Sequence, residues 1–84
     1  MAGGYHLTDI KKGVLGESSK ILEEALELID AEQQACKIMS LVELSDLIGA
    51  IEKYLEKYFP DISIDDLKKM SSITRRAFEL GERQ

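Results

Sequence analysis

Apolar side chains recur with helical spacing in three successive segments of this chain. From residue 17 to about residue 35, and again from about 39 to 59, leucine and isoleucine return every three or four positions and so form one wide arc on each helix. A third segment, 63–80, has the same spacing and begins with a serine N-cap and two acids in the first turn. Pro60 separates the second segment from the third. The pattern predicts an all-α protein of three helices.

The first two helices are expected to fold back on each other as a hairpin. One unbroken helix would hold Glu24 and Glu43 roughly 28 Å apart, at 1.5 Å per residue, whereas an antiparallel hairpin brings them together. On each helix the acids border the apolar arc on the same side, so packing the two arcs together would align the acids along one side of the seam. We predict a helical hairpin plus a third helix within a single domain spanning 1–84, with 1–16 as an N-terminal arm and 17–80 as the helical core.

The predicted apolar arcs carry more surface than one short chain can enclose. The chain has 84 residues, of which 44% are hydrophobic, and a small domain buries only part of the surface of its unfolded chain. Monomeric proteins rarely expose apolar patches beyond a few hundred Å². We therefore expect a dimer at least, in which helices of several chains form one helix bundle.

Composition argues against several classes of partner. The net charge of −5, from 11 basic and 16 acidic residues, disfavours a nucleic-acid surface. There is no apolar run of about 20 residues and no charged-then-apolar leader, so neither a membrane span nor a signal peptide is expected. Cys36 is the only cysteine, which rules out an intrachain disulfide and suits the cytoplasm. We expect a cytoplasmic protein that binds neither nucleic acid nor membranes.

Two pairs of acids carry the candidate chemistry. Glu24 and Glu27 are three residues apart, as are Glu43 and Asp46, and this spacing puts each pair on one helix face. Both pairs border apolar arcs, where ionised side chains are costly unless something compensates their charge. Carboxylate oxygens are hard ligands that suit Mg²⁺, and Mn²⁺ as an alternative. The spacing predicts one metal site that handles phosphates.

Simpler interpretations exist for each of these residues. Glu24 and Glu27 could belong to a solvated helix face, and Ser40 with Glu43 matches a capping box at a helix start. His6, the only histidine, is a weak candidate for a general base because it lies in the arm. Five basic residues are either ligands for the phosphates of a substrate or ordinary surface charge: Lys20, Lys53, Lys57, Arg75 and Arg76.

The two acidic motifs resemble a known signature. Glu23-Glu24-Ala25-Leu26-Glu27 followed by Glu43-Leu44-Ser45-Asp46 is similar to the EExxE…ExxD pattern of the MazG-like all-α nucleotide pyrophosphohydrolases, and the flanking residues resemble a small single-domain phage and bacterial branch. The resemblance implies hydrolysis of nucleoside triphosphates to monophosphate and pyrophosphate with Mg²⁺, by homodimers or homotetramers. It implies Glu24, Glu27, Glu43 and Asp46 as metal ligands and Glu23 as an outer-shell or base-like acid.

Mechanistically, Glu23 or Glu27 would accept a proton from the attacking water. Two other functions are compatible with the same residues. One is a helical interaction module without catalysis, in which the acids are solvated charge. The other is the same hydrolytic site acting on an alarmone or a damaged nucleotide.

Overall fold

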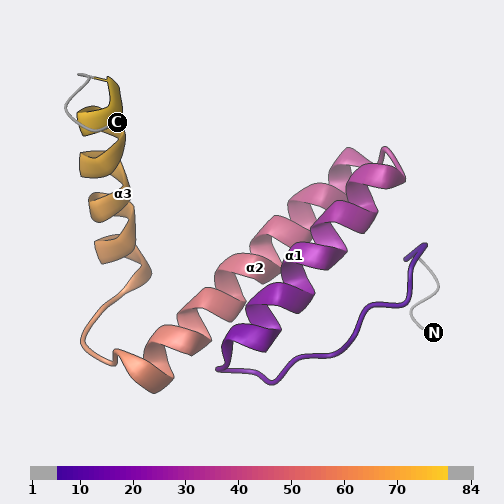
Figure 1. The fold of residues 1–84 in the computed structure, drawn as a ribbon, viewed down its shortest axis with the longest axis horizontal. Helices are drawn as coiled ribbons and strands as arrows, with labels where there is room; N and C mark the ends of the chain where they lie inside the picture. Colours follow the sequence, from indigo (N-terminus) through magenta and orange to yellow (C-terminus); the bar gives the residue numbers. More distant parts are fainter. Residues whose placement is uncertain (1–5, 80–84) are drawn as a thin grey trace.

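The computed structural model describes residues 6–79, apart from the side chains of residues 77 and 78, and contains only helices and irregular segments over that range. Helices α1 (Ser18–Gln33) and α2 (Lys37–Tyr58) form a packed hairpin, and α3 (Ile64–Glu79) follows a short connection (Figure 1). The predicted all-α fold and hairpin are therefore confirmed. The predicted end of the third helix at Leu80 and the first five residues of the arm lie outside the described residues.

The turn between α1 and α2 uses an alanine where a glycine is usual. Ala35 has a φ of 57°, in the left-handed region. Its N–H donates to the carbonyl of Glu32 at 2.9 Å, and the N–H of Cys36 donates to the carbonyl of Ala31 at 3.3 Å. This is the pair of hydrogen bonds of a Schellman motif, whose left-handed position favours glycine. The turn lets α2 begin at Lys37, two residues before the predicted start.

The N-terminal arm is irregular and lies alongside the hairpin, in the opposite direction to α1 (Figure 1). At one end the Asp30 carboxylate accepts the backbone N–H of Leu7 at 2.8 and 2.9 Å. It also accepts the backbone N–H and the hydroxyl of Thr8, at 2.8 and 2.9 Å. Farther along, the Glu23 carboxylate accepts the N–H of Gly13 at 2.9 Å. Two buried acids of α1, Asp30 and Glu23, thus bind the arm at two separate positions.

Gly13 is required where the arm meets the first turn of α1. A Cβ atom at this position would lie 2.2 Å from the carbonyl oxygen of Ser19, a distance at which backbone atoms must move apart. The backbone of the arm therefore reaches Glu23 only because residue 13 has no side chain.

The hairpin packs through its acidic faces, and this corrects the prediction that the apolar arcs form the seam. Among the described residues only Ala31, Ala50 and Leu55 are buried apolar side chains. The acids buried in the same region are Glu23, Glu24, Glu27, Asp30 and Glu43. The outer face of the hairpin carries exposed apolar side chains: Leu22, Leu26 and Ile29 of α1, and Leu41, Leu44 and Ile48 of α2. Two small residues in the seam and the donors of the arm allow the acids to pack inward.

Helix α3 extends away from the hairpin and contacts α2 but not α1 (Figure 1). Its start matches the prediction, because the Ser63 hydroxyl accepts the N–H of Asp66 at 3.2 Å and the Asp66 carboxylate accepts the N–H of Ser63 at 2.9 Å. Met70 and Ile73 on α3 are 59% and 67% exposed. Among the described residues, no helix is long and apolar enough to cross a membrane.

Candidate metal centre

Four carboxylates converge between the two helices of the hairpin. Glu24 and Glu27 come from α1, Glu43 and Asp46 come from α2, and one oxygen of each lies within 4.8 Å of the others. Glu24, Glu27 and Glu43 are 5%, 9% and 0% exposed, whereas Asp46 is exposed. We call these four residues the acid cluster. Glu24 and Glu27 are thus buried and only Asp46 of the four is exposed, so the interpretation of Glu24 and Glu27 as a solvated helix face is wrong.

Glu43 is the most informative member of the acid cluster. Its side chain is completely buried, and neither carboxylate oxygen has a hydrogen-bond partner; one oxygen of Glu24 is in the same state. The capping-box interpretation of Glu43 is wrong, because α2 begins at Lys37 and Glu43 lies well inside the helix. A buried carboxylate without donors costs several kcal/mol by general estimates. Oxygen atoms in this condition, close to three other carboxylates, fit a hard divalent cation.

The close approach of the carboxyl groups also raises the pKa of one member of the acid cluster. Burial, the adjacent Glu43 carboxyl and the negative charge of Glu24 together raise the pKa of Glu27 from 4.5 to about 8. Without a cation, Glu27 is therefore largely protonated at neutral pH. A bound cation would reverse this preference, because it stabilises the ionised form of each carboxylate that faces it.

Glu23 lies next to the acid cluster but is occupied by other contacts. Its carboxylate accepts the N–H of Gly13 at 2.9 Å and lies 3.1 Å from Lys20 Nζ and 3.6 Å from Lys12 Nζ. Burial alone would raise the pKa of Glu23, but the hydrogen bonds from Gly13 and Lys20 more than offset it, and the pKa falls below its usual value. Glu23 is thus an ionised residue that positions the arm and Lys20.

One further buried acid of the site, Asp30, was not singled out by the sequence. Asp30 is 1% exposed beneath the arm, and the neighbouring Glu23 is 2% exposed. Burial alone would raise the pKa of Asp30, but hydrogen bonds from Leu7, Gln34 and Thr8 hold it well below the usual range. The row Glu23, Glu27 and Asp30, at positions i, i+4 and i+7, was the signal available in the sequence.

The position of His6 is a further feature that the sequence did not predict. Its Nε2 lies 3.7 Å from Glu27 Oε1, and its Nδ1 lies 3.6 Å from Asp30 Oδ1. The arm therefore brings the histidine against the acid cluster. Nothing in the sequence indicates this contact, because it joins segments more than 20 residues apart whose approach depends on Asp30.

Among the basic candidates, Lys20 lies against the acid cluster. Its Nζ is 3.1 Å from a carboxylate oxygen of Glu23 and 3.1 Å from one of Glu24. Its side chain is 25% exposed, so it borders the cluster on one side and water on the other. Although burial alone would lower the pKa of Lys20, hydrogen bonds from Lys20 to Glu24 and Glu23 raise it, and the amine stays charged.

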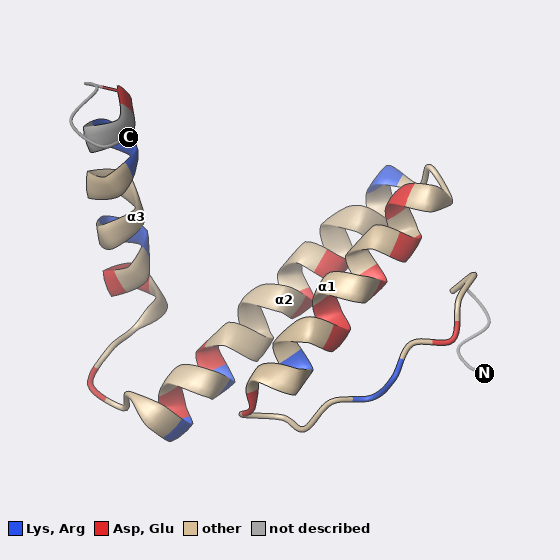
Figure 2. Ribbon diagram, in the orientation of Figure 1, with Lys and Arg blue, Asp and Glu red and all other residues tan. Residues whose placement is uncertain are grey.

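The other basic candidates lie elsewhere in the chain. Lys53 and Lys57 follow Asp46 by 7 and 11 residues, which places them about 10 and 16 Å farther along α2. Lys53 pairs with Glu56 at 3.3 Å, and Lys57 pairs with Glu17 at the base of the hairpin. The exposed side chains of Arg75 and Arg76 lie on α3, which does not contact α1. Acidic residues recur along α1, whereas basic residues lie on the arm, near the start of α1, near both ends of α2 and along α3 (Figure 2).

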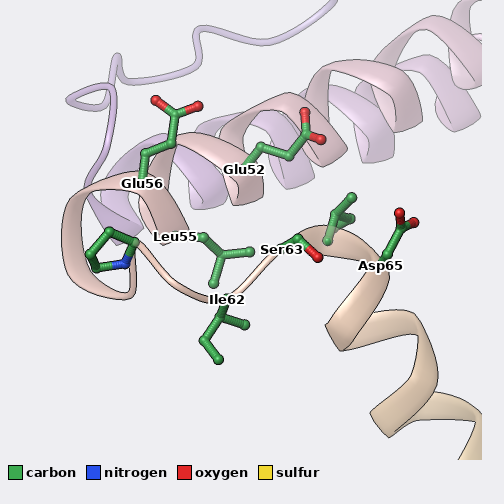
Figure 3. A pocket seen from close by; sticks show the side chains of 8 residues that line it. Glu52, Leu55, Glu56, Ile62, Ser63 and Asp65 are labelled. Atoms are coloured by element: carbon green, nitrogen blue, oxygen red, sulfur yellow. The ribbon is translucent and has the colours of Figure 1, made fainter.

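A separate pocket of 440 Å³ opens where α2 meets the connection to α3 (Figure 3). It contains no member of the acid cluster. Its lining combines three acids with aliphatic side chains and a proline: Glu52, Glu56, Asp65, Leu55, Ile62, Ile64 and Pro60, with Ser63. Acidic side chains repel phosphates, so this pocket is unsuited to a nucleotide tail.

Comparisons with models of known protein families, with curated proteins and with solved structures found no match. The resemblance of the two acidic motifs to the MazG-like pyrophosphohydrolases stays a prediction from those motifs. The geometry of the acid cluster is therefore the basis for a functional proposal.

Proposed function

We propose that this protein is a Mg²⁺-dependent nucleoside triphosphate pyrophosphohydrolase of the MazG-like type. The observation that carries the proposal is the pair of buried Glu43 oxygens without hydrogen-bond donors, in one of four converging carboxylates. A divalent cation is the ligand that this donor set fits. Mn²⁺ has the same preference for oxygen and is the expected substitute. The ExxD and EExxE motifs supply the link from metal binding to nucleotide hydrolysis.

In this proposal Glu24, Glu27, Glu43 and Asp46 hold the cation. When bound, Mg²⁺ polarises phosphate oxygens and lowers the pKa of a coordinated water. The exposed position of Asp46 leaves one side of the cluster open to a substrate.

Water attacks the α-phosphorus, the bond from that phosphorus to the bridging oxygen breaks, and pyrophosphate leaves. The two acids proposed as the base are Glu23 and Glu27. Whichever of them lies outside the inner shell of the cation accepts the proton of the attacking water.

The proposed phosphate ligands are Lys20, Lys53, Lys57, Arg75 and Arg76. Lys20 is favoured for the first contact, because it already borders the acid cluster and stays charged. Since α3 extends away from the hairpin of its own chain, Arg75 and Arg76 fit a neighbouring chain's site better than their own.

We also propose that the chain assembles as a homodimer or homotetramer. The outer face of the hairpin exposes apolar side chains on both helices, including Leu22 at 59% and Leu41 at 67%. Interfaces of obligate homo-oligomers resemble a hydrophobic core cut in half. Light scattering on the purified protein at micromolar concentration tests this proposal. A stable and active monomer of 9.4 kDa would contradict it.

Product identification after incubation with a panel of nucleoside and deoxynucleoside triphosphates tests the hydrolase proposal. Monophosphate with pyrophosphate as the first products, only when Mg²⁺ or Mn²⁺ is present, is the expected result. Diphosphate with orthophosphate would show attack at the γ-phosphorus and contradict the proposal. Turnover confined to alarmones or damaged nucleotides would keep the site and change the substrate. No turnover and no metal binding would favour a helical interaction module.

A further inference from the structure

The arm contributes a nitrogen ligand to a region otherwise made of oxygens. His6 is the only histidine in the chain, and its side chain is 15% exposed. One of its ring nitrogens lies within 4.8 Å of a carboxylate oxygen of Glu27 and of one of Glu43, and those two oxygens lie within 4.8 Å of each other. The three residues come from the arm, α1 and α2, so they meet only when the arm is docked.

The spacing of these atoms suits a shared metal ion. Metal–ligand bonds of about 2.1 Å at tetrahedral angles place neighbouring ligand atoms about 3.4 Å apart. The distance from His6 Nε2 to Glu27 Oε1 is 3.7 Å, which is close to that value and too long for a strong hydrogen bond. Independently, Glu43 is completely buried, and both of its oxygens are without hydrogen-bond donors. Both oxygens of this buried carboxylate are therefore available to coordinate a cation.

We propose that His6, Glu27 and Glu43 form a second metal position, next to the Mg²⁺ position, which takes Zn²⁺ or a similar transition-metal ion in preference to Mg²⁺. Imidazole is a common ligand for Zn²⁺, whereas Mg²⁺ prefers oxygen ligands and keeps several waters. Water completes the coordination. The position shares Glu27 and Glu43 with the Mg²⁺ position, so the two ions compete.

Asp30 is the positioning residue for this second metal position. Its Oδ1 lies 3.6 Å from His6 Nδ1, the ring nitrogen that is not directed at Glu27. Metal-binding histidines usually direct their other ring nitrogen toward a carboxylate or carbonyl, which fixes the ring orientation. Asp30 also binds the backbone of Leu7 and Thr8, so one carboxylate places both the arm and the imidazole. Zinc binding and docking of the arm are therefore coupled.

The test is nuclear magnetic resonance of the histidine side chain in the full chain without a polyhistidine tag. Because His6 is the only histidine, the imidazole ¹⁵N signals belong to it without ambiguity. We expect ZnCl₂, added to protein stripped with EDTA, to shift the Nε2 signal to the range of metal-bound imidazole, and MgCl₂ to leave it in place. An Nε2 signal that does not move at saturating Zn²⁺ would overturn the proposal.

Calorimetric titration of variants separates this metal position from the proposed Mg²⁺ position. His6→Ala should lower Zn²⁺ affinity by about tenfold or more and leave Mg²⁺ affinity unchanged. Asp46→Asn should lower Mg²⁺ affinity while Zn²⁺ still shifts the His6 signal. Asp9→Asn, at an exposed position of the arm, is the matched control and should keep both affinities.

Equal Zn²⁺ affinity in the parent and His6→Ala would refute the second metal position. None of these measurements depends on turnover. Metal binding alone therefore confirms or refutes the second metal position, whether or not the protein hydrolyses nucleotides.

Discussion

Replacing Glu27 with glutamine should stabilise the metal-free protein strongly and in a pH-dependent manner. The pKa of Glu27 rises from 4.5 to about 8 in the folded chain, because of burial, the adjacent Glu43 and the charge of Glu24. A raised carboxyl pKa means that the folded chain binds a proton that the unfolded chain releases. The contribution of Glu27 to stability is therefore largest below pH 4.5 and falls as the pH rises toward 8.

The size of the effect follows from the same pKa values. At pH 7, keeping Glu27 protonated costs about 1.36 kcal/mol for each of the 2.5 units above 4.5, which is about 3 kcal/mol. Glutamine has the shape of the protonated acid and avoids this cost. The amide can also donate a hydrogen bond to the buried oxygens of Glu43. For a domain of this size, about 3 kcal/mol corresponds to a rise in Tm of roughly 12 to 24 °C.

Thermal unfolding followed by circular dichroism in EDTA, at one fixed protein concentration, measures this prediction. The difference in stability between Glu27→Gln and the parent should fall from about 3 kcal/mol at pH 7 to below about 1 kcal/mol at pH 5. Glu32→Gln, at an exposed position of α1, is the control and should change little.

Added Mg²⁺ should reverse the order. At pH 7 the parent should gain about 4.1 kcal/mol at a concentration of 1,000 times Kd, which exceeds the difference of about 3 kcal/mol, while the variant should respond weakly. A stability difference that is equal at pH 5 and pH 7 would refute the assignment of a raised pKa to Glu27.

Three further changes test other parts of the structure. Glu24→Gln and Asp46→Asn should each abolish nucleotide turnover with the helical circular-dichroism signal intact, and turnover at the parental rate in either variant would remove that residue from the metal site. Gly13→Ala should release the arm, seen as faster limited proteolysis before α1, since the new Cβ would lie 2.2 Å from the Ser19 carbonyl oxygen; unchanged cleavage would contradict that close contact. Ala35→Gly should raise stability by up to about 1 kcal/mol in denaturant unfolding, because glycine adopts the left-handed conformation without strain; a loss of stability would show that the alanine side chain matters.

The sequence predicted which acids meet, because helix periodicity determines this directly. Spacing of three residues places Glu24 with Glu27 and Glu43 with Asp46 on their respective faces, and a hairpin then brings the two pairs together. The cap of α3 at Ser63 was predictable for the same reason, since it depends on residues three positions apart. Local rules were sufficient for these features.

The sequence did not predict which face of the hairpin is inside. Hydrophobic patterning assigns the apolar arc to the interior, yet Glu43 is 0% exposed and Leu41 is 67% exposed. The acids pack inward because the arm supplies backbone donors to Glu23 and Asp30, and these contacts join residues 10 to 23 positions apart. The turn at Ala35 was similarly hidden, because neither glycine nor proline marks it. Contacts of this kind depend on the folded chain rather than on local spacing.

The inward acids and the outward apolar side chains have one common consequence. A hairpin that buries Glu24, Glu27 and Glu43 gains little hydrophobic stabilisation from its own seam, where only Ala31, Ala50 and Leu55 are buried apolar residues. In the proposed metal site a cation would relieve the repulsion in the seam, and in the proposed oligomer a second copy would cover the apolar outer face. In the proposed assembly these two events stabilise the same hairpin, so each must strengthen the other by thermodynamic linkage. Removal of Mg²⁺ should then lower both the thermal stability and the association constant, and association that is independent of Mg²⁺ would show that the seam and the outer face act separately.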